Sequence, residues 1–155
     1  MRYFFSLLAL VATATLSAQS LRINEVDEFT GKSKKATTFE QVGYNVTKLK
    51  FSFVAVDDVR GLYAYVLGGD LGCCGTSDSF IMFKFTDGTT MKLEDSADID
   101  CEDTCNGLYV LDADDWNTIK TKSVEKIRVQ HSELYDDIDK GIDASKIRSM
   151  AKMVD

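Results

Sequence analysis

The stretch at residues 79–95, SFIMFKFTDGTTMKLED, decides the fold, because apolar alternation on both sides of an Asp-Gly pair predicts a β-hairpin. A three-residue loop with Gly88 at its bulge sets Phe83 opposite Met91 and gathers the apolar residues on one face. A two-residue loop would instead set Phe83 opposite Lys92. We therefore predict the three-residue loop.

Further strands are expected on both sides of this hairpin. Within 48–58, lysine and serine alternate with Leu49, Phe51 and Phe53, which is typical of a strand with one buried face. The other expected strands are short apolar, aromatic or β-branched runs bounded by turn residues. They lie within 20–29, 34–42, 60–69, 123–130 and 133–139.

Two helices are expected as well. Asp112, followed by more acidic residues, predicts an N-cap and a short helix over 113–121. Asp143 predicts the cap of a C-terminal helix, because apolar residues recur after it at helical spacing. Together the elements predict an α+β fold that is mostly β, with one or more antiparallel sheets arranged as a sandwich or an open barrel.

The N-terminal residues 1–18, MRYFFSLLALVATATLSA, resemble a secretory signal peptide. They carry one positive charge at Arg2, an apolar run and small residues before the cleavage point expected after Ala18. The run is shorter than the roughly 20 apolar residues that a membrane span needs. We therefore expect one globular domain over 19–155, periplasmic or secreted, with no membrane span in the mature chain.

The chain of 155 residues has a formal net charge of −7. It has no clustered Lys/Arg stripe interleaved with aromatic residues, so nucleic acid is not an expected partner. A protein or a glycan partner remains compatible with this composition.

All four cysteines of the chain are expected to form disulfides, because the mature protein is expected outside the cytoplasm. Adjacent Cys73 and Cys74 do not readily pair with each other. They can bond Cys101 and Cys105 respectively, or in the opposite combination. We prefer the first pairing, because the hairpin register, if it continues outward, brings Cys73 opposite Cys101. The spacings differ from the Cys-x-x-Cys of redox and zinc sites.

The acidic segment 94–103 is the alternative chemical site. Its carboxylates are hard oxygen ligands of the kind that calcium prefers. The spacing imitates the start of an EF-hand loop, but the required glycine and the final glutamate are missing. Calcium is therefore an alternative, and no cofactor is assigned. The calcium candidates are Asp98, Asp100, Glu102 and Asp103.

No catalytic residue is assigned, because the sequence contains no nucleophile elbow, zinc-protease motif or phosphate-binding loop. The single histidine, His131, lies in an expected turn. Two short signals mark glycosylation candidates. Asn45 begins the sequon NVT, and Ser96 is the central residue of a DSA triplet.

The order of DEFTGK at 27–32, the 80–95 hairpin, a Lys-Ile-Arg strand at 126–128 and the terminal ASKIRSMAKMV at 144–154 resembles small secreted bacterial proteins of unknown function. In these proteins an Asp-x-Phe-Thr-Gly strand opens the domain. The resemblance implies a periplasmic or secreted protein and no catalytic residue.

These observations favour a disulfide-stapled binding or envelope-associated module. The alternative is a small extracytoplasmic hydrolase or calcium-binding protein that uses the acidic segment 94–103.

Overall fold

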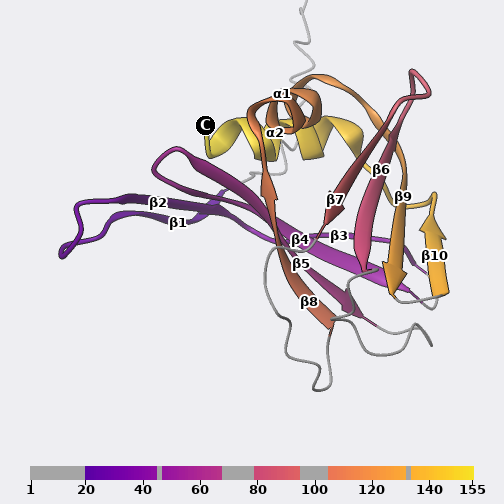
Figure 1. Ribbon diagram of the computed structural model, residues 1–155, viewed down its shortest axis with the longest axis horizontal. Coiled ribbons are helices and arrows are strands. Elements are labelled where there is room, and N and C mark those ends of the chain that lie inside the picture. The colour runs from indigo at the N-terminus through magenta and orange to yellow at the C-terminus, as the bar shows by residue number, and fades with distance from the viewer. Residues whose placement is uncertain (1–19, 45–46, 68–78, 95–104, 132–133) are drawn as a thin grey trace, which may run out of the picture.

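The structure is a computed structural model that describes residues 20–44, 47–67, 79–94, 105–131 and 134–155 (Figure 1). The fold is mostly β, with two antiparallel sheets, one helix in the middle of the chain and one at its C-terminal end. The fold class expected from the sequence is confirmed. The expected signal peptide lies outside the described residues.

Sheet A is formed mainly by the first half of the chain, and sheet B by the second. In sheet A the order is β1 (Leu21–Val26), β2 (Ser33–Thr37), β4 (Lys48–Val56), β5 (Val59–Leu67) and β8 (Cys105–Leu111), and β3 (Glu40–Val42) also pairs with β4. In sheet B the order is β10 (Leu134–Ile138), β9 (Val124–His131), β6 (Phe80–Phe85) and β7 (Thr90–Glu94).

The hairpin β6–β7 has the predicted register. Phe83 lies opposite Met91, and the Phe85 N–H donates to the Thr89 carbonyl over 2.9 Å. Gly88 has a φ of +83°, the left-handed conformation that glycine adopts without steric cost. The three-residue loop is therefore confirmed.

Both helices begin at the expected caps. The Asp112 side chain accepts hydrogen bonds from two backbone N–H groups at the start of α1 (Ala113–Thr121). Asp143 does the same for α2 (Ala144–Met153). These carboxylates satisfy donors that have no partner within the helix.

The first strand is shorter than expected, because β1 ends at Val26 and the motif at 27–31 forms a turn. Asp27 Oδ1 accepts the backbone N–H groups of Phe29 and Thr30, over 3.1 and 2.9 Å. An aspartate that bonds the backbone two and three residues later closes a turn instead of continuing a strand.

The expected strand over 34–42 is two strands, β2 and β3, which pair with different parts of β4. Between them, residues 37–39 lie opposite only Ser52 and Phe53, so the register shifts by one residue. The Thr37 hydroxyl accepts the Phe53 N–H over 3.1 Å, and the Ser52 hydroxyl donates to the Thr37 carbonyl over 2.8 Å. Buried side chains thus satisfy backbone groups that the bulge leaves without a ladder partner.

Strand β8 was not among the sequence-based expectations. All residues from Leu108 to Leu111 are apolar. The segment therefore lacks the alternation of apolar and polar residues that indicates a strand with one solvent-exposed face. In the structure Tyr109 and Leu111 are buried, whereas Leu108 and Val110 are exposed on the outer face of sheet A.

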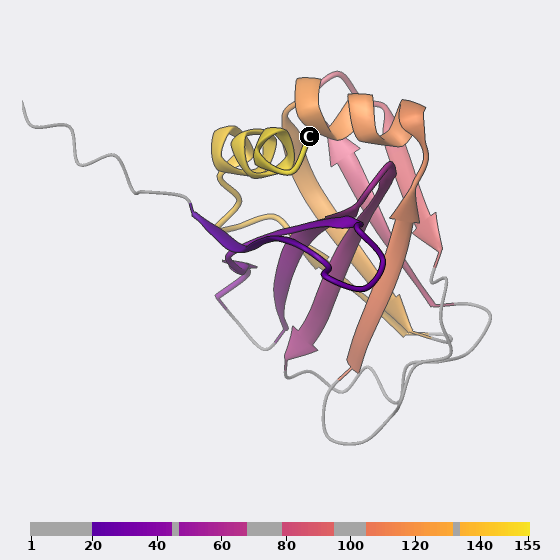
Figure 2. The ribbon, with the colours of Figure 1, turned by 90° about the vertical axis from the view of Figure 1, so that its left-hand side faces the viewer.

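The two sheets and both helices share one hydrophobic core. Figure 2 shows α1 and α2 side by side across one end of the sheets. None of the helices in the described part of the chain is long and apolar enough to cross a membrane. The largest fully buried side chains are Leu49, Phe51, Phe53, Leu62, Ile81, Phe83, Phe85, Ile119, Ile127, Ile147 and Met150.

Candidate functional site

The outer face of sheet B carries aromatic and cationic side chains in an otherwise acidic protein. Residues that lie opposite each other in an antiparallel ladder share a face, so the register defines this surface. The opposite face of sheet B points into the core and includes the buried Ile81, Phe83, Ile127 and Val129. Across the outer face run three rows: Glu94, Phe80, Gln130 and Tyr135; then Lys92, Met82, Arg128 and Asp137; then Thr90, Lys84 and Lys126.

Arg128 is held in place on this face by two neighbours on β10. Its guanidinium carbon lies 4.1 Å from the centre of the Tyr135 ring. Its Nε and one terminal nitrogen donate to the two carboxylate oxygens of Asp137, over 2.6 and 2.9 Å. This hydrogen bonding raises the pKa of Arg128 and lowers that of Asp137. The side chain is therefore charged and oriented before any ligand arrives.

A second cation, Lys92, lies against an aromatic ring at the other side of the face. Its Nζ is 4.5 Å from the centre of the Phe80 ring and forms an ion pair of 2.8 Å with Glu94. Cation and ring contacts of this length are attractive and keep both groups near the surface.

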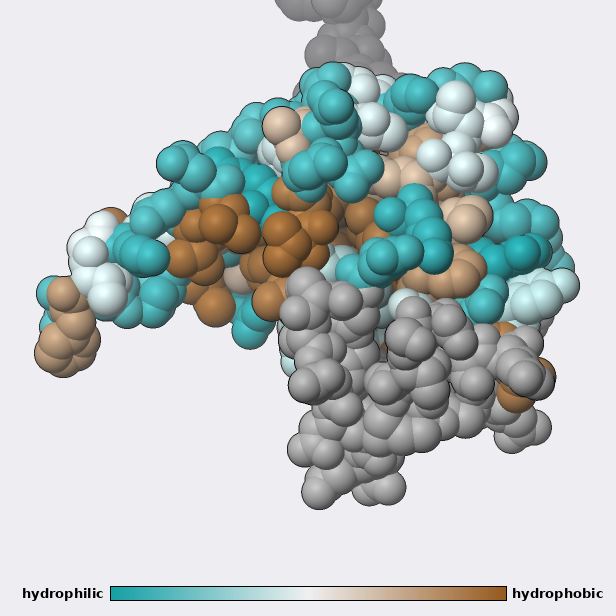
Figure 3. Space-filling view, in the orientation of Figure 1, coloured by the Kyte–Doolittle hydropathy of each residue, from teal (hydrophilic) through white to brown (hydrophobic). Residues whose placement is uncertain are grey.

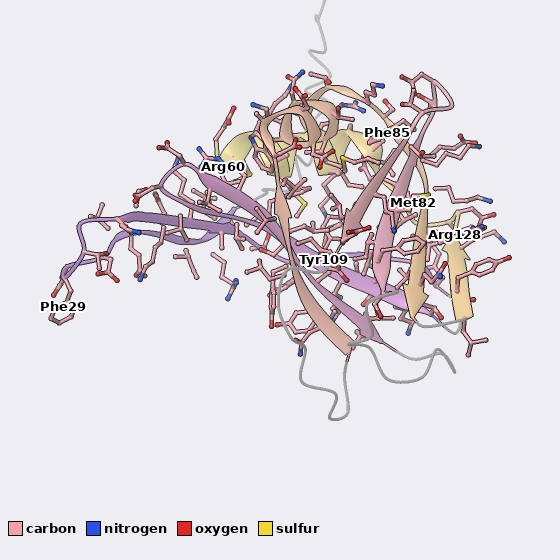
Figure 4. The ribbon with its side chains drawn as sticks, viewed as in Figure 1. Phe29, Arg60, Met82, Phe85, Tyr109 and Arg128 are labelled. Carbon is pink, nitrogen blue, oxygen red and sulfur yellow. The ribbon has the colours of Figure 1, made fainter. Side chains whose placement is uncertain are left out.

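Beside Arg128 lies a hollow of about 180 Å³ on the outer face of sheet B, lined by residues of β6, β7, β9 and β10. Figure 4 shows Met82 and Arg128 from these neighbouring strands next to each other. Met82 supplies an apolar side chain, and the aliphatic stems of lysine and arginine side chains can cover further apolar surface. The lining residues are Met82, Lys84, Thr90, Lys126, Arg128 and Asp137.

The edge of the hollow has two like charges directly opposite each other. Lys84 pairs with Lys126 in the ladder, an arrangement that destabilises a sheet. Their closest carboxylates, Glu125 for Lys84 at 3.3 Å and Asp137 for Lys126 at 3.8 Å, form long and partly exposed ion pairs. These ion pairs are weak in water, so they neutralise the positive charge of the two lysines only in part.

The charges of this face oppose those of the whole chain. Four of its side chains are cationic, namely Lys84, Lys92, Lys126 and Arg128. The carboxylates that contact them are Glu94, Glu125 and Asp137. The surface is therefore positive by one charge in a chain of net charge −7.

A second hollow, of about 210 Å³, lies between the turn after β3 and strand β10. Some of its polar groups bond each other: the Thr47 hydroxyl donates to Asp136, and the Gly43 N–H donates to the Lys140 carbonyl over 3.1 Å. Its lining holds three aspartates and a single lysine, so it lacks the clustered cations of the first hollow and is the weaker candidate.

The outer face of sheet A is a third candidate surface. Figure 3 shows apolar side chains gathered between the β1–β2 hairpin and the rest of the protein. The exposed apolar residues of this face include Val56, Val59, Leu108 and Val110.

The predicted disulfide residues are described only in part. Cys73, Cys74 and Cys101 lie outside the described residues, and Cys105 begins β8 opposite Val66. The register from which the pairing was predicted is confirmed as far as Phe80 and Glu94. Both disulfide combinations remain predictions.

The calcium and glycosylation candidates also lie outside the described residues. These are Asp98, Asp100, Glu102, Asp103, Asn45 and Ser96. Among the residues that the structure does describe, no group of three His, Cys, Asp or Glu side chains is placed to hold a metal ion.

Sequence reasoning did not identify the outer face of sheet B. One signal was present in FIMFKF, where Phe80 and Met82 occupy the positions that alternate with the buried Ile81 and Phe83. Apolar residues on both faces of a hairpin strand indicate a second contact surface. The Lys-Ile-Arg motif completes this surface, because Ile127 is buried while its two cationic neighbours face outward.

The overall arrangement is a cationic hollow with an apolar side chain in it, flanked by an arginine that a ring and a carboxylate hold in place. Comparisons of the chain with protein families, curated proteins and solved structures found no match.

Proposed function

We propose that this protein is an exported, disulfide-bonded binding module whose sheet B binds an acidic peptide segment of a protein partner. The observation that carries the proposal is the Lys84–Lys126 pair beside Met82 and Arg128. A like-charge pair costs stability in the free protein, and an anionic ligand between the two lysines relieves that cost.

The ligand class follows from the chemistry of the hollow. Carboxylates of the ligand complement the lysines, and one apolar side chain fits against Met82. Asp137 bonds one edge of the Arg128 guanidinium and sets its position before binding, and the remaining N–H groups can donate to a ligand carboxylate. Aromatic residues, methionine and arginine are also the residue types enriched in protein interfaces.

The faces of the aromatic rings favour a peptide over a glycan. Arg128 covers Tyr135, and Lys92 covers Phe80. A sugar ring that stacks on these aromatics would first have to displace the cations. An acidic peptide instead bonds the cations where they lie.

Export and the disulfides are parts of this proposal that rest on the sequence alone. The signal-peptide pattern and the even number of cysteines support them. The alternative function, a hydrolase or calcium-binding protein that uses segment 94–103, stays a prediction because most of this segment lies outside the described residues.

The proposal is tested with oxidised protein of residues 19–155 and three labelled pentapeptides, EEFEE, EEGEE and KKFKK, by fluorescence anisotropy. We expect EEFEE to bind most tightly, EEGEE more weakly because it lacks the apolar side chain, and KKFKK not at all. Binding of EEFEE should weaken as salt is raised, because the lysine pair is partly exposed.

A charge reversal locates the binding surface. Lys84→Glu should weaken EEFEE binding by about tenfold or more, since a charge-assisted hydrogen bond contributes on the order of 1.5 kcal/mol. Lys152→Glu is the matched control, because it changes the net charge equally at an exposed position of α2. Equal binding by both variants, or equal binding of EEFEE and KKFKK, contradicts the proposal.

A further inference from the structure

The β1–β2 hairpin projects from the body of the protein and carries an exposed aromatic ring at its tip. Figures 1 and 4 show the hairpin extending to one side, with Phe29 at its end. Phe29 is 97% exposed. An aromatic side chain fully in water at the end of a projecting hairpin offers apolar surface to a partner.

The turn that displays this ring is tightly bonded. Asp27 Oδ1 accepts the backbone N–H groups of Phe29 and Thr30 and the hydroxyl of Thr30. Asp27 Oδ2 pairs with Lys34 on β2. These bonds hold the pKa of Asp27 well below its usual range. The backbone at Phe29 is thereby fixed before binding, which reduces the entropy that association would cost.

We propose that the acidic segment bound by sheet B is the hairpin tip of a second copy of this chain. Phe29 of one copy enters the hollow beside Met82 of the next, and the neighbouring Glu28 lies against Lys84 and Lys126. This inference rests on the proposed function, because it names the partner of the same surface.

The size of the hollow and the carboxylate of Glu28 fit this occupant, and the turn at 27–32 carries two carboxylates against one lysine. The hollow measures about 180 Å³, and a cavity of about 150 Å³ can hold a benzene ring. Glu28 is exposed beside Phe29, so the tip offers a carboxylate and a ring together. The hollow offers the complementary lysine pair and an apolar methionine.

Each contact joins two different surfaces of the chain. Tip and hollow lie on different sheets, so one copy contributes its tip and the next contributes its hollow. Such a heterologous contact leaves an unused tip at one end and an unused hollow at the other. Copies can then add to form a ring or an open chain. A contact of this size is weak, so association depends on concentration.

The test is sedimentation velocity of the oxidised protein of residues 19–155 over a concentration series. The parent protein should sediment faster as its concentration rises. Phe29→Ala, which removes the ring, and Met82→Glu, which places a like charge in the path of Glu28, should each remain monomeric. Phe29→Leu keeps an apolar side chain and should restore part of the association.

The decisive sample is an equimolar mixture of the Phe29→Ala and Met82→Glu variants. One of them keeps an intact hollow and the other an intact tip, so the mixture should form a one-to-one dimer that grows no further. Circular dichroism establishes that each variant is folded. If Met82→Glu is not folded, Lys84→Glu at the more exposed edge of the hollow takes its place.

Val110→Ser is the control for the apolar outer face of sheet A and should associate like the parent. Three results overturn the inference: a parent that is monomeric at every concentration, a mixture that stays monomeric, or association that Val110→Ser abolishes and Phe29→Ala does not. Failure here is distinct from failure of the proposed function. The monomeric Phe29→Ala variant should still bind EEFEE, and loss of that binding would count against the proposed function instead.

Discussion

At the scale of single residues, Asp155 joins three elements. Its carboxylate accepts from the Trp116 indole N–H over 2.9 Å and from Lys120 Nζ over 2.7 Å, both on α1. Its backbone carbonyl accepts from Lys35 Nζ on β2 over 2.7 Å. The indole nitrogen of a buried tryptophan needs a partner, and here Asp155, two residues after the end of α2, supplies it.

Two replacements of Asp155 should separate what its hydrogen bond with Trp116 and its ion pair with Lys120 each contribute to the free energy of unfolding. Asp155→Ala leaves the Trp116 N–H without its acceptor and should lower the free energy of unfolding by about 1 kcal/mol. Asp155→Asn keeps an acceptor and loses only the partly exposed pair with Lys120, so its effect should be smaller. Urea titration followed by Trp116 fluorescence measures both. Equal losses in the two variants would show that the indole bond contributes nothing.

At the scale of elements, sequence reasoning succeeded where the deciding contacts are local. The 80–94 hairpin depends on its own alternation and loop, and both helices depend on a capping aspartate and the turn that follows it. Sequence reasoning failed at the bulge between β2 and β3, because the extra residue there is defined only by pairing with β4. It also missed β8, because the apolar run of this strand lacks the local alternation that indicates a strand.

The candidate site could not be predicted from the sequence, because it too depends on pairing between distant strands. Phe80 and Met82 belong to β6, whereas Lys126 and Arg128 belong to β9, about 45 residues later in the chain. The sequence indicates that these residues face outward, but it does not indicate that β6 and β9 are neighbours. The Lys84–Lys126 pair, which carries the proposed function, exists only in that pairing.

The bulge gives a prediction at this scale. Thr37→Val preserves the shape of the side chain but leaves the buried Phe53 N–H without an acceptor. This should cost on the order of 1–3 kcal/mol in the free energy of unfolding. Thr38→Val changes the adjacent, exposed threonine in the same way and is the matched control. Denaturant titration should show a clear loss for the first variant and almost none for the second, and equal effects would contradict this account of the bulge.

At the scale of the whole molecule, carboxylates connect different elements, two of them across a hairpin and two across longer stretches of the sequence. Asp27 bonds β2, Asp87 pairs with Lys122 beyond α1, Asp137 bonds β9, and Asp155 bonds α1. Hydrogen bonds and ion pairs to the ionised forms lower the pKa of all four. The folded state therefore binds protons less readily at these groups than the unfolded chain does.

These shifts predict the direction of the pH dependence. A carboxylate whose pKa is lower in the folded state stabilises the protein above its unfolded pKa of about 4, and this stabilisation is lost as the pH falls towards the folded value. Asp115 acts in the opposite direction, because desolvation and the nearby Asp112 and Asp114 raise its pKa. Among the described carboxylates several lowered pKa values oppose the raised one of Asp115, so the free energy of unfolding should be steady near neutral pH and fall below about pH 4. Urea titrations at a series of pH values measure it, with added salt reducing the effect because the pairs are largely exposed. Stability that is unchanged or higher at pH 3 would show that these pairs contribute little to the folded state.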